Sequence, residues 1–372
     1  MRKNRKVKKN LLFVVPTWSL GGTEKVNVTV AEKLAEHNTV SLYTLCTPDK
    51  SIYPVNNAEL YGEWTSSFRF FIRLSGLLGL LHLDTLNRSL LKNKAKRITR
   101  FSQKNNIDTI IVSGSSIYLI PFLKAQNPDK KVIAWCHFSA SIYLGGYLRY
   151  TTSFWVKGLA AADEVICLTE EDKNKFLEIN KRVQVINNPI TIDNDEVSSL
   201  EEKVISWTGR IANPQKGIDY LAKVSAQLPQ GWKISIAGDG DMELMKNLLQ
   251  HYGAEDKVIL HGALAGQDLK QHYLNSSIYL MTSRFEGFGL VLVEAMSFGL
   301  PIVAFNQTGS NHVLDGGRYG ILVENGNVNQ MVEKLQSLIT DFDTRKMYQE
   351  KSLDRVKTFS LDKVVRSWEN IL

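Results

Sequence analysis

The sequence predicts an α/β protein of two domains, each built on a parallel sheet. The chain has 372 residues, which exceeds one ordinary α/β domain and suggests two separate cores. Short apolar runs alternate with amphipathic stretches along both halves. This alternation is typical of βα units, whose strands assemble into parallel sheets.

The first domain is predicted to span residues 1–190. It begins with a buried strand at Leu11–Val15, followed by a turn at Gly21-Gly22 and a helix through about Leu34. Its other strands are predicted at residues 40–45, 107–112, 132–135, 164–168 and 183–186.

Residues 191–203 are polar and acidic without periodicity, so we place the interdomain linker there. The second domain is predicted at 203–358, and residues 359–372 form one more amphipathic helix, for which packing back on the N-terminal domain is one arrangement. The strands of the second domain are predicted at residues 204–208, 233–237, 258–261, 278–281, 301–304 and 320–323.

Charge is distributed unevenly along the chain. Residues 1–190 contain 27 Lys and Arg but only 15 Asp and Glu, whereas the remaining residues contain 18 and 23. An asymmetry of this size suggests that the N-terminal half faces an anionic surface or ligand.

Residues 68–100 combine an apolar stretch with many cations. Such a helix can lie in a membrane interface, with its apolar side among acyl chains and its cations on lipid phosphates. The alternative is an ordinary helix packed on the sheet with a solvated basic side, and the sequence leaves both interpretations open.

The sequence favours a cytoplasmic protein. No apolar run reaches the roughly 20 residues that span a bilayer. The basic first residues resemble a secretory signal, but Pro16 cuts the apolar run short, so we interpret them as a basic tail. The three cysteines are scattered, which favours neither a disulfide framework nor a metal site.

The strongest functional signal lies at residues 282–299, where a strand is followed by a glycine-bearing loop and a helix that begins near Leu290. Free amides and the positive dipole end at such a helix start bind anions. Gly287 and Gly289 let the backbone approach a phosphate closely. Glu286 and Glu294 can both face one ligand, and a carboxylate can accept two hydrogen bonds from a vicinal diol.

Two cations and a histidine follow predicted strands. Arg210 and Lys216 come just after the first strand of the second domain, at the sheet edge where open α/β folds bind ligands. A cation pair there would neutralise a diphosphate. His137 follows the strand at 132–135 and could orient a ligand or donate a hydrogen bond. The alternatives are solvated cations and a structural histidine.

These motifs resemble those of the retaining glycosyltransferases of family 4, which have the GT-B fold of two Rossmann-like domains facing across a cleft. The family's Glu-x7-Glu pattern is matched by Glu286 and Glu294, and its Gly-Arg and Lys-Gly pairs by Gly209-Arg210 and Lys216-Gly217. Gly21-Gly22-Thr23-Glu24 resembles the family's Gly-Gly-x-Glu. The resemblance covers essentially the whole chain.

The resemblance implies a nucleotide-sugar donor and assigns roles to individual residues. His137 and Glu286 are expected to act in catalysis. The expected donor-binding residues are Gly21, Gly22, Arg210, Lys216, Gly287, Phe288, Gly289, Leu290, Val291 and Glu294. The chain departs from the family at Thr308–Asn311, because the carboxylate that usually follows the glycines, and that the family uses near the sugar or acceptor, is missing.

We expect no metal ion and no other cofactor. Asp239-Gly240-Asp241 has the Asp-x-Asp spacing of some metal-dependent transferases, but it follows a strand and is interpreted as a turn with helix-start acids. The family generally does not need a bound metal.

The sequence therefore predicts transfer of a hexose, favoured as a UDP-sugar, to a growing cell-surface glycan. The expected acceptor is a glycan linked to a polyprenyl diphosphate, reached from the cytoplasm or from a peripheral position on the inner face of the membrane. No nucleic-acid partner is expected. The alternatives are a nucleotide-sugar epimerase of GT-B fold and a non-catalytic, membrane-associated scaffold. A dinucleotide dehydrogenase is disfavoured because Gly-x-Gly-x-x-Gly is missing after the first strand.

Overall fold

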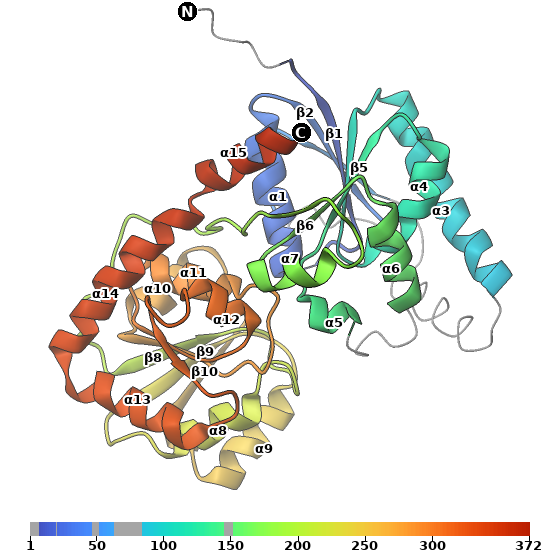
Figure 1. Ribbon diagram of the computed structural model, residues 1–372. Helices are drawn as coiled ribbons and strands as arrows, with labels where there is room; N and C mark the ends of the chain where they lie inside the picture. The colour runs from blue at the N-terminus through green and yellow to red at the C-terminus, as the bar shows by residue number, and fades with distance from the viewer. Residues whose placement is uncertain (1–6, 20, 47–51, 63–83, 145–151) are drawn as a thin grey trace, which may run out of the picture. The chain divides into compact units, whose positions relative to one another are not determined.

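The computed structural model divides into two compact units, which are described separately (Figure 1). The first unit comprises Met1–Pro189 together with Leu361–Leu372, and the second comprises Ile190–Ser360. The structure describes residues 7–19, 21–46, 52–62, 84–144 and 152–372.

The first unit contains a parallel sheet of seven strands within the described residues, in the order β3-β2-β1-β4-β5-β6-β7. The central strands are buried on both faces, so they read as near-continuous apolar runs. The strands are β1 (Asn10–Val15), β2 (Thr39–Thr44), β3 (Glu59–Gly62), β4 (Thr109–Ser113), β5 (Lys131–Trp135), β6 (Glu164–Cys167) and β7 (Val183–Val185).

Helices follow most strands of this sheet, and the C-terminal helix returns to it. Figure 1 shows α15, drawn in red, beside α1, drawn in blue. Trp368 of α15 packs edge-on against Trp135 of β5, with ring centroids 4.7 Å apart. The helices are α1 (Gly22–Ala35), α3 (Asp84–Lys104), α4 (Ile120–Gln126), α5 (Ala140–Leu144), α6 (Thr152–Ala161), α7 (Glu170–Phe176) and α15 (Leu361–Ile371), with a 3₁₀ turn at Gly114–Leu119.

The second unit contains a parallel sheet of six strands, in the order β10-β9-β8-β11-β12-β13. Its core is apolar and includes Trp207, Ile236 and Phe305, each about fully buried. The strands are β8 (Val204–Thr208), β9 (Lys233–Ala237), β10 (Val258–Gly262), β11 (Ile278–Met281), β12 (Ile302–Phe305) and β13 (Ile321–Val323).

The helices of the second unit follow its strands, and several begin at the sheet edge where the strands end. They are α8 (Ile218–Ala226), α9 (Met242–Tyr252), α10 (Gly266–Leu274), α11 (Leu290–Ser297), α12 (Thr308–Val313), α13 (Val328–Thr340) and α14 (Phe342–Val356), with 3₁₀ turns at Glu255–Lys257 and Lys357–Phe359.

The predicted fold class, two α/β domains with parallel sheets, is confirmed. Strand β3 was not predicted, because Glu59–Gly62 is short, lies at the edge of the sheet and is only half buried. Residues 191–203, the predicted linker, lie inside the second unit. Of the predicted apolar and basic segment 68–100, residues 68–83 lie outside the described ranges, and residues 84–100 belong to helix α3.

Candidate functional site

An ion pair joins two loops at the strand ends of the second unit. Lys216 lies in the loop after β8, and its Nζ is 2.6 Å from Oε1 of Glu286, in the loop after β11. Both side chains are largely covered, with 14% and 11% exposed. Removing two charges from water to this extent is costly, so stability alone is a weak reason to keep the pair. The pair instead places a cation and a carboxylate where a ligand can meet both.

Local backbone geometry brings Lys216 to this position. Gly217 caps the start of α8 with φ at +60°, and a Cβ there would lie 2.2 Å from the carbonyl oxygen of Thr282. Only glycine fits both the left-handed conformation and the close approach. The Thr282 hydroxyl then donates to the carbonyl of Lys216 over 2.9 Å. The glycine of the Lys-Gly motif therefore lets the two loops touch.

Helix α11 begins beside this pair. Gly289 adopts φ +87° at the N-cap, and Leu290 and Val291 occupy the first turn, half buried. First-turn amides have no partner inside their helix, so these N–H groups are suited to an anion. Phe288 is buried and packs edge-on against Phe359 at 5.6 Å, which anchors the loop. Its neighbour Gly287 is also buried.

Glu294, the second carboxylate of the motif, is buried with 4% of its surface exposed. Its Oε1 accepts a hydrogen bond from the Thr191 hydroxyl over 2.8 Å, and its Oε2 accepts one from the Tyr273 hydroxyl over 3.2 Å. A carboxylate offers about four acceptor positions, and these two hydroxyls occupy two of them. Its neighbours fix the orientation of the group.

Arg210 differs from Lys216, because its side chain is exposed. The structure brings the backbone beside it close to the ion pair: a Cβ on Gly209 would lie 3.5 Å from Nζ of Lys216. The two cations are therefore neighbours along the same loop, but only Lys216 is held by a carboxylate.

The segment that departs from the family pattern forms the start of α12. Gln307 caps this helix, and its Oε1 accepts from the amides of Gly309 (2.8 Å) and Glu286 (3.1 Å). Gln307 thus ties the departing segment to the Glu286 loop. Thr308–Asn311 contains no carboxylate. The Gln307 side chain instead contacts the backbone of Glu286.

Asp239 and Asp241 accept hydrogen bonds from backbone amides. Asp241 caps α9 and accepts from the amide of Leu244 over 2.9 Å, while Asp239 Oδ1 accepts from the amide of Gly240 over 2.8 Å. These contacts agree with the interpretation of the motif as a turn with a helix-start acid. Among the residues that the structure describes, no group of three or more His, Cys, Asp or Glu side chains is arranged to hold a metal ion.

In the first unit, His137 follows β5 and is 7% exposed. Its Nε2 lies 3.1 Å from Nδ2 of Asn27. The Oδ1 of Asn27 accepts from the Ser113 hydroxyl over 2.9 Å, and Nδ2 also donates to the carbonyl of Thr23. Because Asn27 donates to Nε2, the neutral ring carries its proton on Nδ1. Burial lowers the pKa of His137 to about 3.

The Nδ1 of His137 is buried and has no hydrogen-bond partner among the described residues. A buried donor without a partner is costly, so such groups are rare unless a ligand or water completes them. His137 is therefore prepared to donate one hydrogen bond.

The Gly21-Gly22 turn starts helix α1 in the same unit. The Gly21 amide donates to the Tyr53 hydroxyl over 2.9 Å, and that hydroxyl lies 3.0 Å from the Gly21 carbonyl. Glu24 folds back over the turn, since a Cβ on Gly21 would lie 2.8 Å from its Oε2. Burial raises the pKa of Glu24, although hydrogen bonds, first that from Thr17, act in the opposite direction.

Sequence reasoning missed several side chains that hold these sites together. The hydroxyls of Tyr53 and Tyr273 and the amide of Gln307 belong to no motif that was recognised. Arg284, two residues before Glu286, could have been noticed, because it lies within the strongest motif. Polar side chains that lie far from a motif in sequence, such as Tyr53, cannot be recognised as its partners from the sequence alone.

Comparisons with known proteins place the chain in a family. Residues 20–194 match the family described as Glycosyltransferase Family 4, and residues 190–355 match Glycosyl transferases group 1. An uncharacterized glycosyltransferase of Haemophilus influenzae is 30% identical over 98% of this chain and 100% of its own length. The amylovoran biosynthesis glycosyltransferase AmsD of Erwinia amylovora is 24% identical over 98% of this chain and 99% of its own.

Solved structures show the same fold. The crystal structure of Anabaena HepE in complex with UDP-glucose superposes with a TM-score of 0.75 at 17% identity, covering 98% of this chain and 100% of that one. The predicted GT-B fold and the resemblance to family 4 are thereby confirmed. The chain belongs to the group 1, family 4 type glycosyltransferases of GT-B fold.

Proposed function

We propose that this glycosyltransferase transfers a hexose with retention from a UDP-sugar to a hydroxyl of a lipid-linked, cell-surface glycan. The observation that carries the donor assignment is the Lys216–Glu286 pair beside the first turn of α11. A diphosphate there would meet the ammonium of Lys216 and the amides of Leu290 and Val291. Glu286 would then be free to accept hydrogen bonds from the sugar.

UDP is favoured because related folds bind it. HepE has been crystallised with UDP and with UDP-glucose. In our proposal the bond between the sugar's anomeric carbon and the diphosphate breaks, and the acceptor oxygen forms the new bond on the same face. The proton of the acceptor hydroxyl passes to the departing phosphate. Lys216 and the helix amides stabilise the negative charge that develops on the diphosphate.

Three further predicted residues have supporting roles in this proposal. Glu294 accepts hydrogen bonds from the ribose diol, and Arg210 screens the diphosphate from the loop it shares with Lys216. In the first unit, His137 donates from Nδ1 to a substrate hydroxyl. Because burial keeps the imidazole neutral, His137 acts as a hydrogen-bond donor rather than as a cation.

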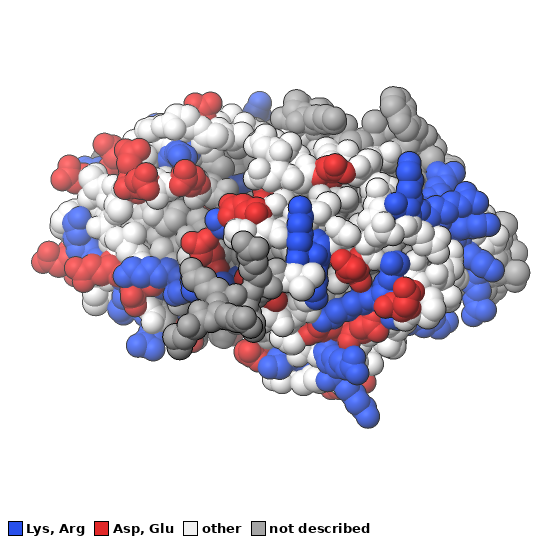
Figure 2. Space-filling model, turned by 90° about the horizontal axis from the view of Figure 1, so that it is seen from above, with Lys and Arg blue, Asp and Glu red and all other residues white. Residues whose placement is uncertain are grey.

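The lipid-linked acceptor is supported by the basic surface of α3. Figure 2 shows Lys and Arg side chains gathered at the edge of the molecule where Figure 1 has α3. The exposed cations of this helix are Arg88, Lys92, Lys96, Arg97, Arg100 and Lys104. Cations on one helix attract anionic lipid headgroups and diphosphates. On this basis we propose peripheral binding to the membrane. No described helix is both long and apolar enough to cross a membrane.

Donor and reaction can be tested together. UDP-, GDP- and ADP-sugars are compared for the rise in melting temperature that they cause, since a ligand of the folded state stabilises it. The best donor is then incubated with and without a polyprenyl-diphosphate-linked glycan. We expect stabilisation by a UDP-sugar and a product only with acceptor. Isomerised nucleotide sugar without acceptor would instead show an epimerase, and failure to bind any nucleotide sugar would contradict the proposal.

Membrane binding is tested by flotation with vesicles containing anionic lipid. Replacing both Lys96 and Arg100 with Glu should abolish flotation, because α3 would then be repelled by the anionic lipid instead of attracted to it. The matched control is Lys246→Glu on α9, an exposed cation of the second unit, which should leave flotation unchanged. Flotation that survives the α3 reversals would contradict this part of the proposal.

A further inference from the structure

Arg284 joins the two loops of the donor site through both its backbone and its side chain. Its amide donates to the carbonyl of Gln215 over 2.8 Å. Its Nη1 donates to the carbonyl of Pro214 over 2.9 Å, and this carbonyl lies two residues before Lys216. One residue of the Glu286 loop therefore holds the Lys216 loop at two successive carbonyls.

The same guanidinium also holds the start of α8. It pairs with the carboxylate of Asp219 through two hydrogen bonds, of 2.9 Å from Nη1 and 2.6 Å from Nη2. Paired N–H···O bonds of this kind fix the orientation of both groups. The pair is partly covered, with 26% of Arg284 and 23% of Asp219 exposed.

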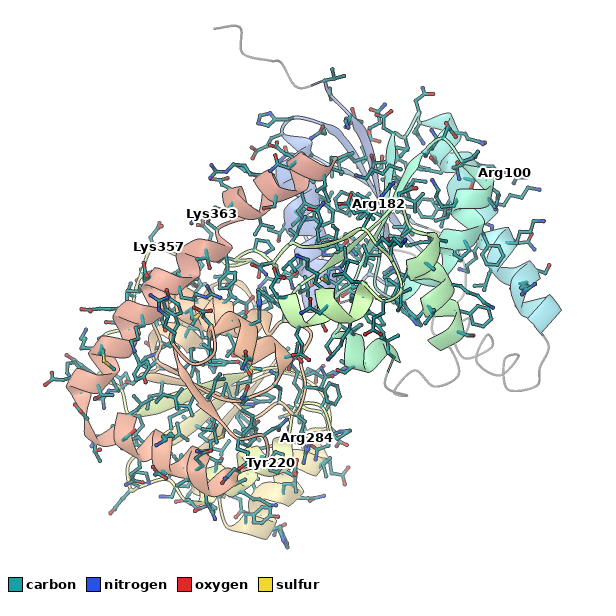
Figure 3. The ribbon with its side chains drawn as sticks, viewed as in Figure 1. Arg100, Arg182, Tyr220, Arg284, Lys357 and Lys363 are labelled. Carbon is teal, nitrogen blue, oxygen red and sulfur yellow. The ribbon has the colours of Figure 1, made fainter. Side chains whose placement is uncertain are left out.

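The ring of Tyr220 covers one face of the guanidinium. The central carbon of Arg284 lies 4.0 Å from the centroid of that ring, and Figure 3 shows the two side chains together. Stacking of this kind restrains the planar group further. The hydrogen-bond partners and the stacked ring belong to residues 214–220, which flank Lys216 on both sides.

We propose that Arg284 is a positioning residue for the diphosphate site. It contacts no ligand itself and acts by fixing the loop that carries Lys216. The 2.6 Å contact between Lys216 and Glu286 depends on the conformation of that loop. Arg284 holds the backbone at residues 214 and 215, directly before Lys216. A small displacement of Lys216 would move its amine away from the charge that it must stabilise.

This inference rests on the proposed function, since it needs a diphosphate at Lys216. Its test compares UDP with UMP, because only UDP has the second phosphate that Lys216 would contact. By calorimetry, Arg284→Ala should weaken UDP binding roughly tenfold, while the dissociation constant of UMP stays within about twofold of wild type. Arg284→Lys keeps the charge but loses the paired hydrogen bonds, so it should restore UDP binding only in part.

A double-mutant cycle distinguishes positioning from a direct or a general structural effect. If Arg284 acts through Lys216, Arg284→Ala added to Lys216→Ala should cause little further loss of UDP affinity. The matched control is Arg318→Ala, because Arg318 likewise pairs with an aspartate, Asp315, and lies over a tyrosine, Tyr319, in the same unit. This control should leave the ratio of UDP to UMP affinity unchanged.

The possible outcomes separate this inference from the proposed function. If wild type binds UDP tightly and Arg284→Ala binds it equally well, or if the losses from Arg284→Ala and Lys216→Ala add, the positioning role is wrong and the donor assignment stands. If wild type binds neither UDP nor GDP, both fail. Should Arg284→Ala not fold, Asp219→Asn releases the same contact with a smaller change and must also lower the ratio of UDP to UMP affinity.

Discussion

In the second unit Lys216 and Glu286 form an ion pair, whereas in the first unit burial keeps His137 neutral. Lys216 and Glu286 lie in loops that follow strands, whereas His137, just after β5, contacts Asn27 of helix α1. The second unit joins its loops with charged pairs, and the first uses a chain of neutral hydrogen bonds through Asn27 and Ser113. The difference suggests a division of labour, in which the second unit binds a charged diphosphate and the first positions neutral hydroxyls.

The largest effect should come from removing the ammonium group of Lys216. Lys216→Ala should lower kcat/KM for sugar transfer by about 10²–10³-fold, because it removes one stabiliser of the developing charge. Steady-state rates with the identified donor measure this effect, with Lys246→Ala as the matched surface control. A kcat/KM within about twofold of the wild-type value would show that Lys216 does not stabilise the diphosphate.

The next effect concerns the buried carboxylate of the second unit. Glu294→Gln keeps the size of the side chain but replaces one acceptor oxygen with a donor. We expect UDP to bind roughly tenfold more weakly. Wild type should prefer UDP to 2′-deoxy-UDP, and the variant should lose that preference. A variant that keeps the full preference would show that Glu294 has a purely structural role.

A smaller effect should appear in the stability of the first unit at acidic pH. His137 has a folded pKa of about 3, below its value of about 6.5 in the unfolded chain. The unfolded state therefore binds more protons, and stability falls as the pH drops from about 6.5 towards 3. Between pH 7 and pH 5 this histidine should account for a loss of about 2 kcal/mol.

Chemical denaturation at both pH values measures that loss. His137→Asn should be less sensitive to acid than wild type by about this amount. Glu24 and Asp172, whose pKa values burial raises, act in the opposite direction, but they do so in both proteins and therefore cancel. An equal loss in variant and wild type would show that His137 is not held neutral.

The smallest effect is a control on the aspartates of the second unit. Asp241→Ala should cost about 1 kcal/mol of stability, because it removes the cap of α9. The variant should bind UDP with wild-type affinity, and EDTA should not change that affinity. If this variant, or EDTA acting on wild type, abolished UDP binding, the Asp239–Asp241 turn would have to be reinterpreted as a metal site.

Much of the fold was predictable because most strands are apolar runs bounded by turns. Residues 204–208, 233–237 and 278–281 were predicted with the boundaries that β8, β9 and β11 have. Strand β3 could not be predicted, since Glu59–Gly62 has no apolar run and pairs only with its neighbour β2.

The site was predictable where it follows a local motif. Glu286, Gly289 and Lys216 lie in recognisable patterns, and the structure brings them to one sheet edge. Partners such as Gln307 could not be found, because nothing in the sequence indicates that an amide will bridge two loops. The tautomer of His137 likewise depends on Asn27, which is 110 residues away.

A crystal structure of the protein with UDP tests the central claim most directly. We predict that a β-phosphate oxygen lies within about 3 Å of Nζ of Lys216 and of the amides of Leu290 or Val291. A β-phosphate bound elsewhere, with Lys216 still paired only to Glu286, would contradict the account.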